Sequence, residues 1–236
     1  MKKRKGTVLM ALGLVLMLAA LGLTVYNMRT EMQAGETSAM VVEQLRVQRA
    51  EQRSTATPVP AATPEATAEA VAEATEAPQA TQAVLPLATV APDYIRFPDM
   101  EMPTVEMDGE MYIGTVEIPE LGLVLPVMSE WSYPRLKKAP CRFSGSAYTG
   151  DLIIIAHNYV SHFGNLKKLR PGATVRFVDM AGNVFCYEVA ETEILQPDQI
   201  EALQGTDYPL TLLTCTLGGE TRVTVRCDKV MEIPAR

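Results

Sequence analysis

Histidine, cysteine and tryptophan are scarce in this chain of 236 residues. It has two histidines, four cysteines and one tryptophan. These residues do not have the spacing of metal ligands, and no glycine-rich segment has the pattern that cradles phosphates. The formal net charge is −7, although four basic residues stand at positions 2–5. We therefore expect no metal, no cofactor and no nucleic-acid partner, since nucleic-acid binding usually needs a basic surface.

Charge is absent from Thr7 to Tyr26, where the sequence reads TVLMALGLVLMLAALGLTVY. About twenty such residues match the thickness of a bilayer core, so residues 7–26 are expected to form a single-pass transmembrane anchor. The basic residues before it predict a cytoplasmic N-terminus at 1–6 and an extracellular remainder. A cleaved signal peptide is the alternative, but the apolar run is long for a signal and no A-x-A site follows it.

Lysine, arginine and aromatic residues are absent from positions 54–92, which are mostly Ala, Thr, Pro and Glu. Such a segment buries too little apolar surface to offset the entropy lost on ordering, so we expect a disordered spacer. The preceding residues, 27–53, show no strong apolar stripe, and we interpret them as a juxtamembrane stalk. Residues 93–236 are enough for one domain with a single core. The pattern indicates an extracellular domain held away from a cell membrane.

Long helical segments are few in this domain, which alternates short apolar runs with turn signals. Seven runs are predicted as strands: 111–118, 123–127, 151–156, 174–179, 183–192, 210–215 and 222–230. Short helical turns are expected at Phe163–Leu169 and Pro197–Leu203, where a proline opens the second. Seven or eight short strands predict an all-β domain, either a sandwich or a closed barrel.

A Gly-Gly pair, Gly218 and Gly219, separates the last two predicted strands. A tight hairpin loop with positive φ favours glycine, and in the resulting register Cys215 lies directly opposite Arg222. Their Cβ atoms would then be about 4.5 to 5.5 Å apart. A cation at that distance stabilises negative charge on the sulfur, and on the oxygen of a carbonyl that the sulfur attacks.

Alternation along the same two strands sorts the neighbouring residues. Arg226 shares the face of Cys215 but pairs with Thr211, about 13 Å farther along the strand, so Arg222 is the expected partner. Cys227 points to the opposite face and is expected to be structural. The plain alternative is that Cys215 is a small buried apolar residue and Arg222 an exposed strand residue.

The two histidines, His157 and His162, both follow the apolar run DLIIIA at 151–156. His157 stands where this strand leaves the core and a loop begins, which is where catalytic groups collect. His162 lies within the loop and fits a surface or rim position. We therefore favour His157 as a general acid and base for a cysteine nucleophile.

Three further cysteines are Cys141, Cys186 and Cys227. In an extracytoplasmic domain two of them would be able to form a disulfide. Free buried thiols are at least as probable, and the sequence does not choose between these alternatives.

The segment TLLTC at 211–215, the Arg222 that opens the next strand, and the upstream IIIAHN and HFGNL together resemble the sortases. These are membrane-anchored cysteine transpeptidases of Gram-positive bacteria. YIGTVEIPELGLVLPV, near the start of the domain, is similar to the opening strands of the family. The resemblance implies a closed eight-stranded β-barrel with short helices. It also implies that Cys215 is the nucleophile, His157 the general acid and base, and Arg222 the residue that binds substrate or oxyanion.

The implied function is that of a thiol peptidase that cleaves a C-terminal sorting signal, LPxTG or a variant, in surface proteins. The resulting thioester would pass its acyl group to an amine of a peptidoglycan precursor or a pilin subunit. Ala156 stands where many members have glycine, and the connection from Cys215 to Arg222 is very short. Class B or class D-like forms both fit these features.

Two alternatives lie outside the sortases. An L,D-transpeptidase would also use cysteine and histidine, but its Ser-His-Gly-Cys signature is missing from Thr211–Cys215. A membrane-tethered β-barrel that binds wall or protein ligands without catalysis is the non-enzymatic alternative.

Overall fold

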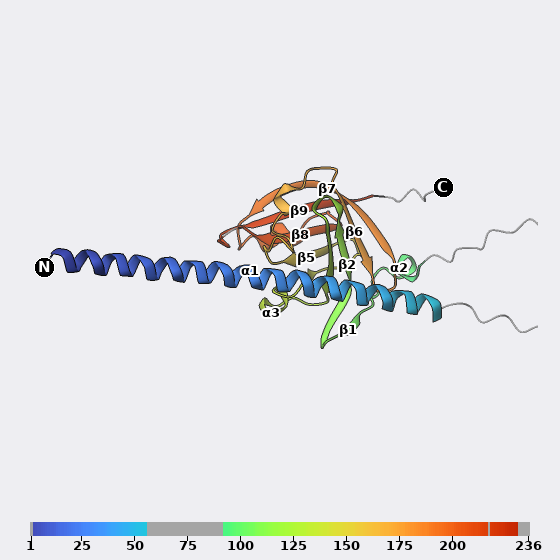
Figure 1. Cartoon of the computed structure of the whole chain (residues 1–236). Coiled ribbons are helices and arrows are strands. Elements are labelled where there is room, and N and C mark those ends of the chain that lie inside the picture. The colour runs from blue at the N-terminus through green and yellow to red at the C-terminus, as the bar shows by residue number, and fades with distance from the viewer. Residues whose placement is uncertain (1, 56–91, 217, 231–236) are drawn as a thin grey trace, which may run out of the picture.

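The computed structural model of the chain describes residues 2–55, 92–216 and 218–230. The predicted spacer at 54–92 therefore lies almost entirely outside the described residues, as does Leu217. What is described consists of one long N-terminal helix and a β-barrel with short helices (Figure 1).

Nine strands form a single sheet that closes on itself. They are β1 (Val105–Met107), β2 (Glu110–Ile118), β3 (Leu123–Met128), β4 (Cys141–Ser144), β5 (Leu152–Ala156), β6 (Thr174–Asp179), β7 (Val184–Leu195), β8 (Leu210–Cys215) and β9 (Arg222–Lys229). Their order is β1-β2-β3-β4-β5-β8-β9-β7-β6, and β2 also pairs with β6. Eight strands thus complete the barrel and β1 is an extra strand beside β2. This confirms the closed eight-stranded barrel.

Several short elements were not expected from the sequence. Strand β4 has only four residues and β1 only three, which is too short for a clear alternation of apolar and polar residues. The short helices are α2 (Asp93–Arg96), η1 (Pro119–Leu121), α3 (Tyr133–Leu136), η2 (Leu166–Lys168) and α4 (Ile200–Gln204). The last two fall close to the helical turns predicted at 163–169 and 197–203.

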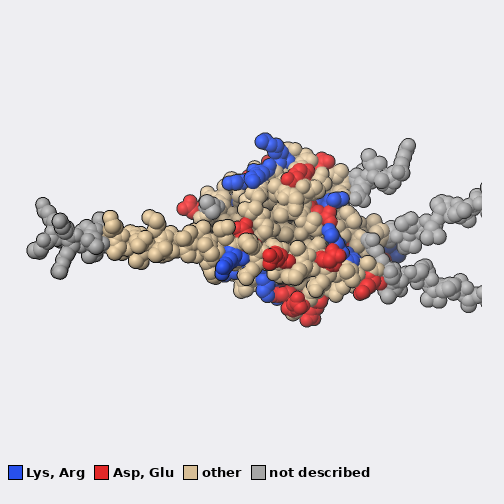
Figure 2. Space-filling model, in the orientation of Figure 1, with Lys and Arg blue, Asp and Glu red and all other residues tan. Residues whose placement is uncertain are grey.

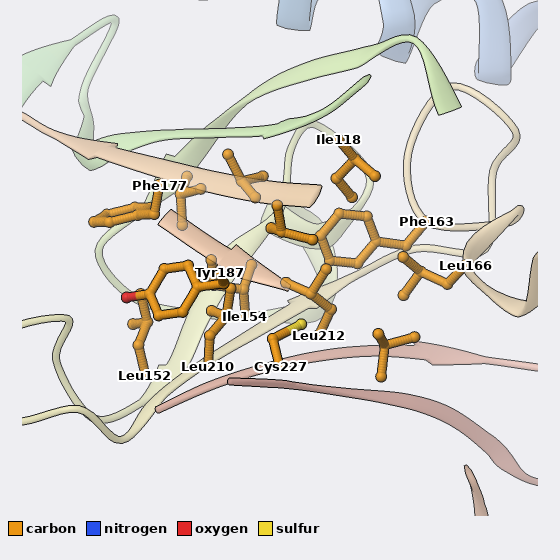
Figure 3. Packing of buried hydrophobic residues seen from close by; sticks show 14 of the residues in the cluster. Ile118, Leu152, Ile154, Phe163, Leu166, Phe177, Tyr187, Leu210, Leu212 and Cys227 are labelled. Atoms are coloured by element: carbon orange, nitrogen blue, oxygen red, sulfur yellow. The ribbon is translucent and has the colours of Figure 1, made fainter. Parts of the chain in front are cut away.

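The main apolar core fills the interior of the barrel. Figure 3 shows side chains of several strands converging there, Ile154, Leu212 and Cys227 among them. Residues at alternate positions point to the other face, where Leu213 joins a smaller cluster with Leu203 of α4. Because side chains alternate along a strand, the residue two positions after Leu213 also belongs to this outer face. That residue is Cys215.

Helix α1 runs without interruption from Lys2 to Thr55. It contains the one stretch of the described residues that is long and apolar enough to cross a membrane, with a mean hydropathy of 1.9 and none of that stretch buried. Figure 1 shows its N-terminal part projecting away from the barrel, and Figure 2 shows the described portion of this projection in tan, without Lys, Arg, Asp or Glu.

The second half of α1, which covers the predicted juxtamembrane stalk at residues 27–53, packs along the barrel (Figure 1). Its buried residues recur every three or four positions: Ala34, Ser38, Val41, Val42 and Leu45. Leu45 is completely buried, in a cluster with residues of β1, β2 and β3. Small side chains at the start of this stripe let the helix approach closely, but they give it little of the apolar signal that sequence patterns rely on.

Candidate active site

The β8–β9 hairpin has the register predicted for it. Cys215 pairs directly with Arg222, and the loop between them contains Gly218 and Gly219 with φ of 90° and 78°. Thr216 N donates to Thr221 O at 2.9 Å, which continues the ladder one step beyond the strands. Glycine is needed here because other residues rarely adopt positive φ. The short loop therefore fixes the thiol opposite the guanidinium.

The parallel pairing of β5 with β8 brings His157 beside Cys215. Ala156 is in register with Thr214, and one step beyond the cysteine Asn158 Nδ2 donates to Thr216 O at 3.4 Å. His157 directly follows the last residue of β5, and Cys215 is the last residue of β8, so both lie between this pair and this hydrogen bond. Adjacent strands lie about 4.8 Å apart. Alternation along the two strands assigns both positions to the outer face at one end of the barrel.

The ring of His157 is held by its two following residues. Tyr159 stacks on it with ring centroids 4.2 Å apart and planes within 4° of parallel. The Asn158 backbone N–H donates to Nδ1 at 3.0 Å, and Asn158 Oδ1 lies 2.9 Å from the same nitrogen. These contacts engage Nδ1 and leave Nε2 for proton transfer. Sequence reasoning missed both neighbours, although an aromatic residue two positions after His157 was the available signal.

An apolar groove of about 350 Å³ leads to this end of the barrel. Ile155 and Leu213 belong to its lining, together with residues of α3, α4 and the loops before them. Cys215 and Arg222 line the same groove. The aromatic lining residues Trp131, Tyr133 and Phe143 come from a part of the chain that the sequence did not associate with the site.

Arg222 and Arg226, four residues apart on β9, have different surroundings. Arg222 is partly exposed, and its Nη1 donates to the carbonyls of Gly219 and Thr221 at 2.9 and 3.1 Å. The hairpin loop therefore orients the guanidinium that lines the groove.

Arg226 is 1% exposed and is part of the packing instead. It forms a 2.7 Å ion pair with Glu193 and donates to Thr211 Oγ1 and to the carbonyls of Ala202 and Leu203. These bonds attach α4 to the barrel, and α4 forms part of the groove wall. The predicted pairing of Arg226 with Thr211 is observed.

His162, the other histidine, is completely buried. Burial, together with the nearby His157, lowers its pKa to about 4, so it is neutral at pH 7. Its Nε2 lies 3.5 Å from Ser38 Oγ of α1. His162 therefore occupies neither a surface position nor the rim, and packs between the barrel loop and α1.

None of the four cysteines forms a disulfide. Cys141 and Cys227 are fully buried, and burial raises the pKa of each thiol to about 12. A buried thiol with so high a pKa stays protonated and is a poor nucleophile. Cys215, by contrast, is partly exposed at the groove.

The arrangement provides a thiol, a base beside it and a cation across from it, at the end of an apolar groove. That set of groups suits acyl transfer through a cysteine thioester. Cys215 and Arg222 are in direct register, and His157 is placed beside them by the neighbouring strand.

Residues 116–230 match the family model described as Sortase domain. No curated protein matches the chain. Solved structures that it resembles include sortase C1 of GBS pilus island 1, at 24% identity with a TM-score of 0.47, covering 56% of this chain and 70% of that one. Sortase C1 from Streptococcus suis matches at 26% identity and 0.45, covering 60% and 80%. Sortase C from Clostridium perfringens SM101 matches at 24% and 0.45, covering 60% and 76%. These descriptions name class C and give no support to the predicted class B or D-like form.

Proposed function

We propose that the chain, whose residues 116–230 match the family model described as Sortase domain, is a membrane-anchored cysteine transpeptidase acting on C-terminal sorting signals. The observation that supports the proposal most is the register of three strands: Cys215 pairs with Arg222, and His157 directly follows Ala156, which pairs with Thr214. The apolar helix at the N-terminus supplies the anchor, with residues 1–6 in the cytoplasm and the barrel outside.

In the first half of the reaction His157 takes the proton of the Cys215 thiol, the sulfur attacks the scissile carbonyl carbon, and a C–S bond forms. The carbonyl oxygen becomes an oxyanion, which the guanidinium of Arg222 stabilises. His157 then gives a proton to the departing amine as the C–N bond breaks. The products are a thioester on Cys215 and the released C-terminal part of the signal.

In the second half an amine of the acceptor attacks the thioester, and His157 removes a proton from the attacking nitrogen. The carbon–sulfur bond breaks and the thiol is restored. Stacking on Tyr159 holds the imidazole in place for both transfers. The reaction needs only the side chains of the domain and its two substrates.

The groove lining supports a peptide substrate of LPxTG type. Its aromatic and aliphatic side chains match the leucine and proline of such a signal, and Cys215 also lines the groove, where it would meet a peptide bond farther along the signal. One of the similar solved structures is titled as sortase C with the C-terminal cell wall sorting motif, and another title refers to pilin substrate specificity. We propose the amine of a pilin subunit or of a peptidoglycan precursor as acceptor.

A panel of sorting-signal peptides incubated with the full chain in detergent or vesicles tests this proposal. Each peptide is offered with a lysine-containing pilin peptide or with a peptidoglycan stem-peptide amine, and the ligated product is measured by mass spectrometry. We expect at least one signal and acceptor pair to give product with the native chain and none with Cys215→Ala. Equal product from the Cys215→Ala chain would contradict the mechanism. The preferred signal and acceptor would also assign the sortase class.

A further inference from the structure

Helix α1 is continuous through the point where its apolar part ends. The uncharged run predicted to span the membrane stops at Tyr26, and the helix continues to Thr55 with no break. A continuous helix bends only gently when it has no proline or other local disruption, so its two halves point in nearly the same direction. The orientation of the barrel relative to the anchor is therefore set by how α1 docks.

The first docking contacts join α1 to the loop that follows His157. Glu31 accepts a hydrogen bond from Val160 N at 2.5 Å, and its carbonyl accepts one from Ser161 Oγ at 3.2 Å. Gly35 packs against Ser161, where an added Cβ would lie 3.2 Å from the serine Cβ. Glu31 comes five positions after Tyr26, which is about 7.5 Å along a helix. The loop that follows His157, called the catalytic loop below, thus lies close to the end of the apolar segment.

The positions of the hairpin and of α2 also place the catalytic end of the barrel toward the apolar part of α1. Figure 1 shows the tip of the β8–β9 hairpin at the end of the barrel from which the N-terminal part of α1 projects. The C-terminal part of α1 and the short helix α2 lie at the opposite end in the same view. Thr55, the last residue of α1, and Asp93, the first residue of α2, therefore belong to the end of the domain away from the anchor.

We propose that α1 holds the barrel directly at the bilayer, with its catalytic end facing the lipid surface and the groove opening there. This rests on the membrane anchoring proposed above. In this arrangement α1 sets the distance of the barrel from the bilayer. Val160, which is 60% exposed beside the first contact of α1, would touch the headgroup region of the bilayer. A peptide substrate still attached to the membrane would reach Cys215 without leaving the surface.

Quenching of tryptophan by brominated lipid tests this orientation in the full chain. Trp131 is the single tryptophan, so Trp131→Phe gives a background in which one new tryptophan reports one position. Val160→Trp places the probe at the catalytic loop and keeps the backbone N–H that donates a hydrogen bond to Glu31. Ile95→Trp, in α2, is the matched control, because Ile95 is equally exposed at 59% but lies at the opposite end.

In phosphatidylcholine vesicles with brominated acyl chains we expect the Val160→Trp chain to lose emission and shift to shorter wavelength, and the Ile95→Trp chain to do neither. Inserting about twelve Gly and Ser residues after Asn27 should remove the quenching, because a flexible segment of that length reaches roughly 20 Å. Equal quenching at both positions, or quenching that survives the insertion, would overturn the orientation.

Two parallel measurements separate this inference from the proposed function. Sedimentation with vesicles after carbonate extraction reports anchoring, and acylation of the native chain by a soluble signal peptide reports catalysis. A chain that sediments and is acylated, but shows no selective quenching at position 160, retains the function and loses the orientation. A chain that does not sediment overturns the anchoring and the orientation together.

Discussion

Cysteine, histidine and arginine each occur in this domain in two contrasting settings, one partly exposed and one in the packing. Cys215 and Arg222 line the groove, His157 directly follows the strand that pairs with β8, and all three are partly exposed. Their counterparts Cys227, His162 and Arg226 are at most 1% exposed.

The two sets differ by position along a strand or loop and not by residue type. Cys227 points into the barrel, whereas Cys215 follows the outward positions of β8. Arg226 uses its guanidinium to hold α4, whereas Arg222 is bound to the hairpin loop and lines the groove. Burial keeps the Cys227 thiol and the His162 imidazole neutral, and the guanidinium of Arg226 is taken up by its packing partners. The buried set is therefore suited to stability and the partly exposed set to chemistry.

Replacing each cysteine by alanine should give the largest contrast. Cys215→Ala removes the nucleophile, and we expect kcat/KM for ligation to fall by at least about 10⁴-fold with the fold retained. Cys227→Ala leaves the site intact and should keep most of the activity while lowering the free energy of unfolding. Steady-state ligation and urea unfolding of both chains check this. Comparable activity in the two variants would break the distinction.

The two arginines should separate activity from stability. Arg222→Ala removes a cation from the developing oxyanion, and a loss of about 10² to 10³ in kcat is expected with little change in unfolding. Arg226→Ala leaves Glu193 and two carbonyls of α4 without their donor, at a cost of about 3 kcal/mol or more in stability. Urea denaturation and ligation kinetics measure both. The reverse pattern would show that the roles of Arg222 and Arg226 are exchanged.

Acidification should destabilise the domain through His162. Its pKa is about 4 in the folded domain and 6.5 as the ordinary value, so between these limits the unfolded chain binds more protons. Above pH 6.5 the imidazole is neutral in both states and costs no stability. As the pH falls below 6.5, the free energy of unfolding declines, by about 3 kcal/mol at pH 4.

The matched variant is His162→Gln, which removes the titrating group from the same site. Its free energy of unfolding should change less between pH 6.5 and 4.5 than that of the native domain, as measured by urea titrations at each pH. Glu110, whose pKa is lowered mainly by its hydrogen bond from Lys138, titrates below this window. An unchanged slope in the variant would contradict the role assigned to His162.

The smallest effect is expected at Tyr159, which only positions His157. Tyr159→Ala removes the stacked ring, and we expect kcat to fall roughly tenfold with KM nearly unchanged. Tyr159→Phe keeps the ring and should restore the native kcat. A variant series in which Phe and Ala behave alike would show that stacking does not position the imidazole.

The hairpin and most strands of the barrel were accessible from the sequence because local rules determine them. Gly218 and Gly219 fix the register of the last two strands, and alternation from Cys215 onward assigns each neighbour to a face. The family resemblance added the eight-stranded closure, which no local pattern contains.

The rest of the site depends on segments far apart in the chain. The groove lining combines Trp131 and Phe143 with α4, and nothing local to these residues indicates that they meet. The docking of α1 was missed because its buried stripe begins with Ala34 and Ser38, whose small side chains carry little apolar signal. The burial of His162 follows from that docking, so it was missed for the same reason.

The central claim is that the partly exposed thiol opposite Arg222 is the one that carries the acyl group. It is tested most directly by incubating the full chain with a sorting-signal peptide that it processes, quenching with acid, and mapping the adduct by mass spectrometry of the digested protein. The account predicts one acyl group per chain, in the peptide that contains Cys215, and none in Cys215→Ala. An adduct on Cys141, Cys186 or Cys227, or an adduct that persists in Cys215→Ala, would contradict it.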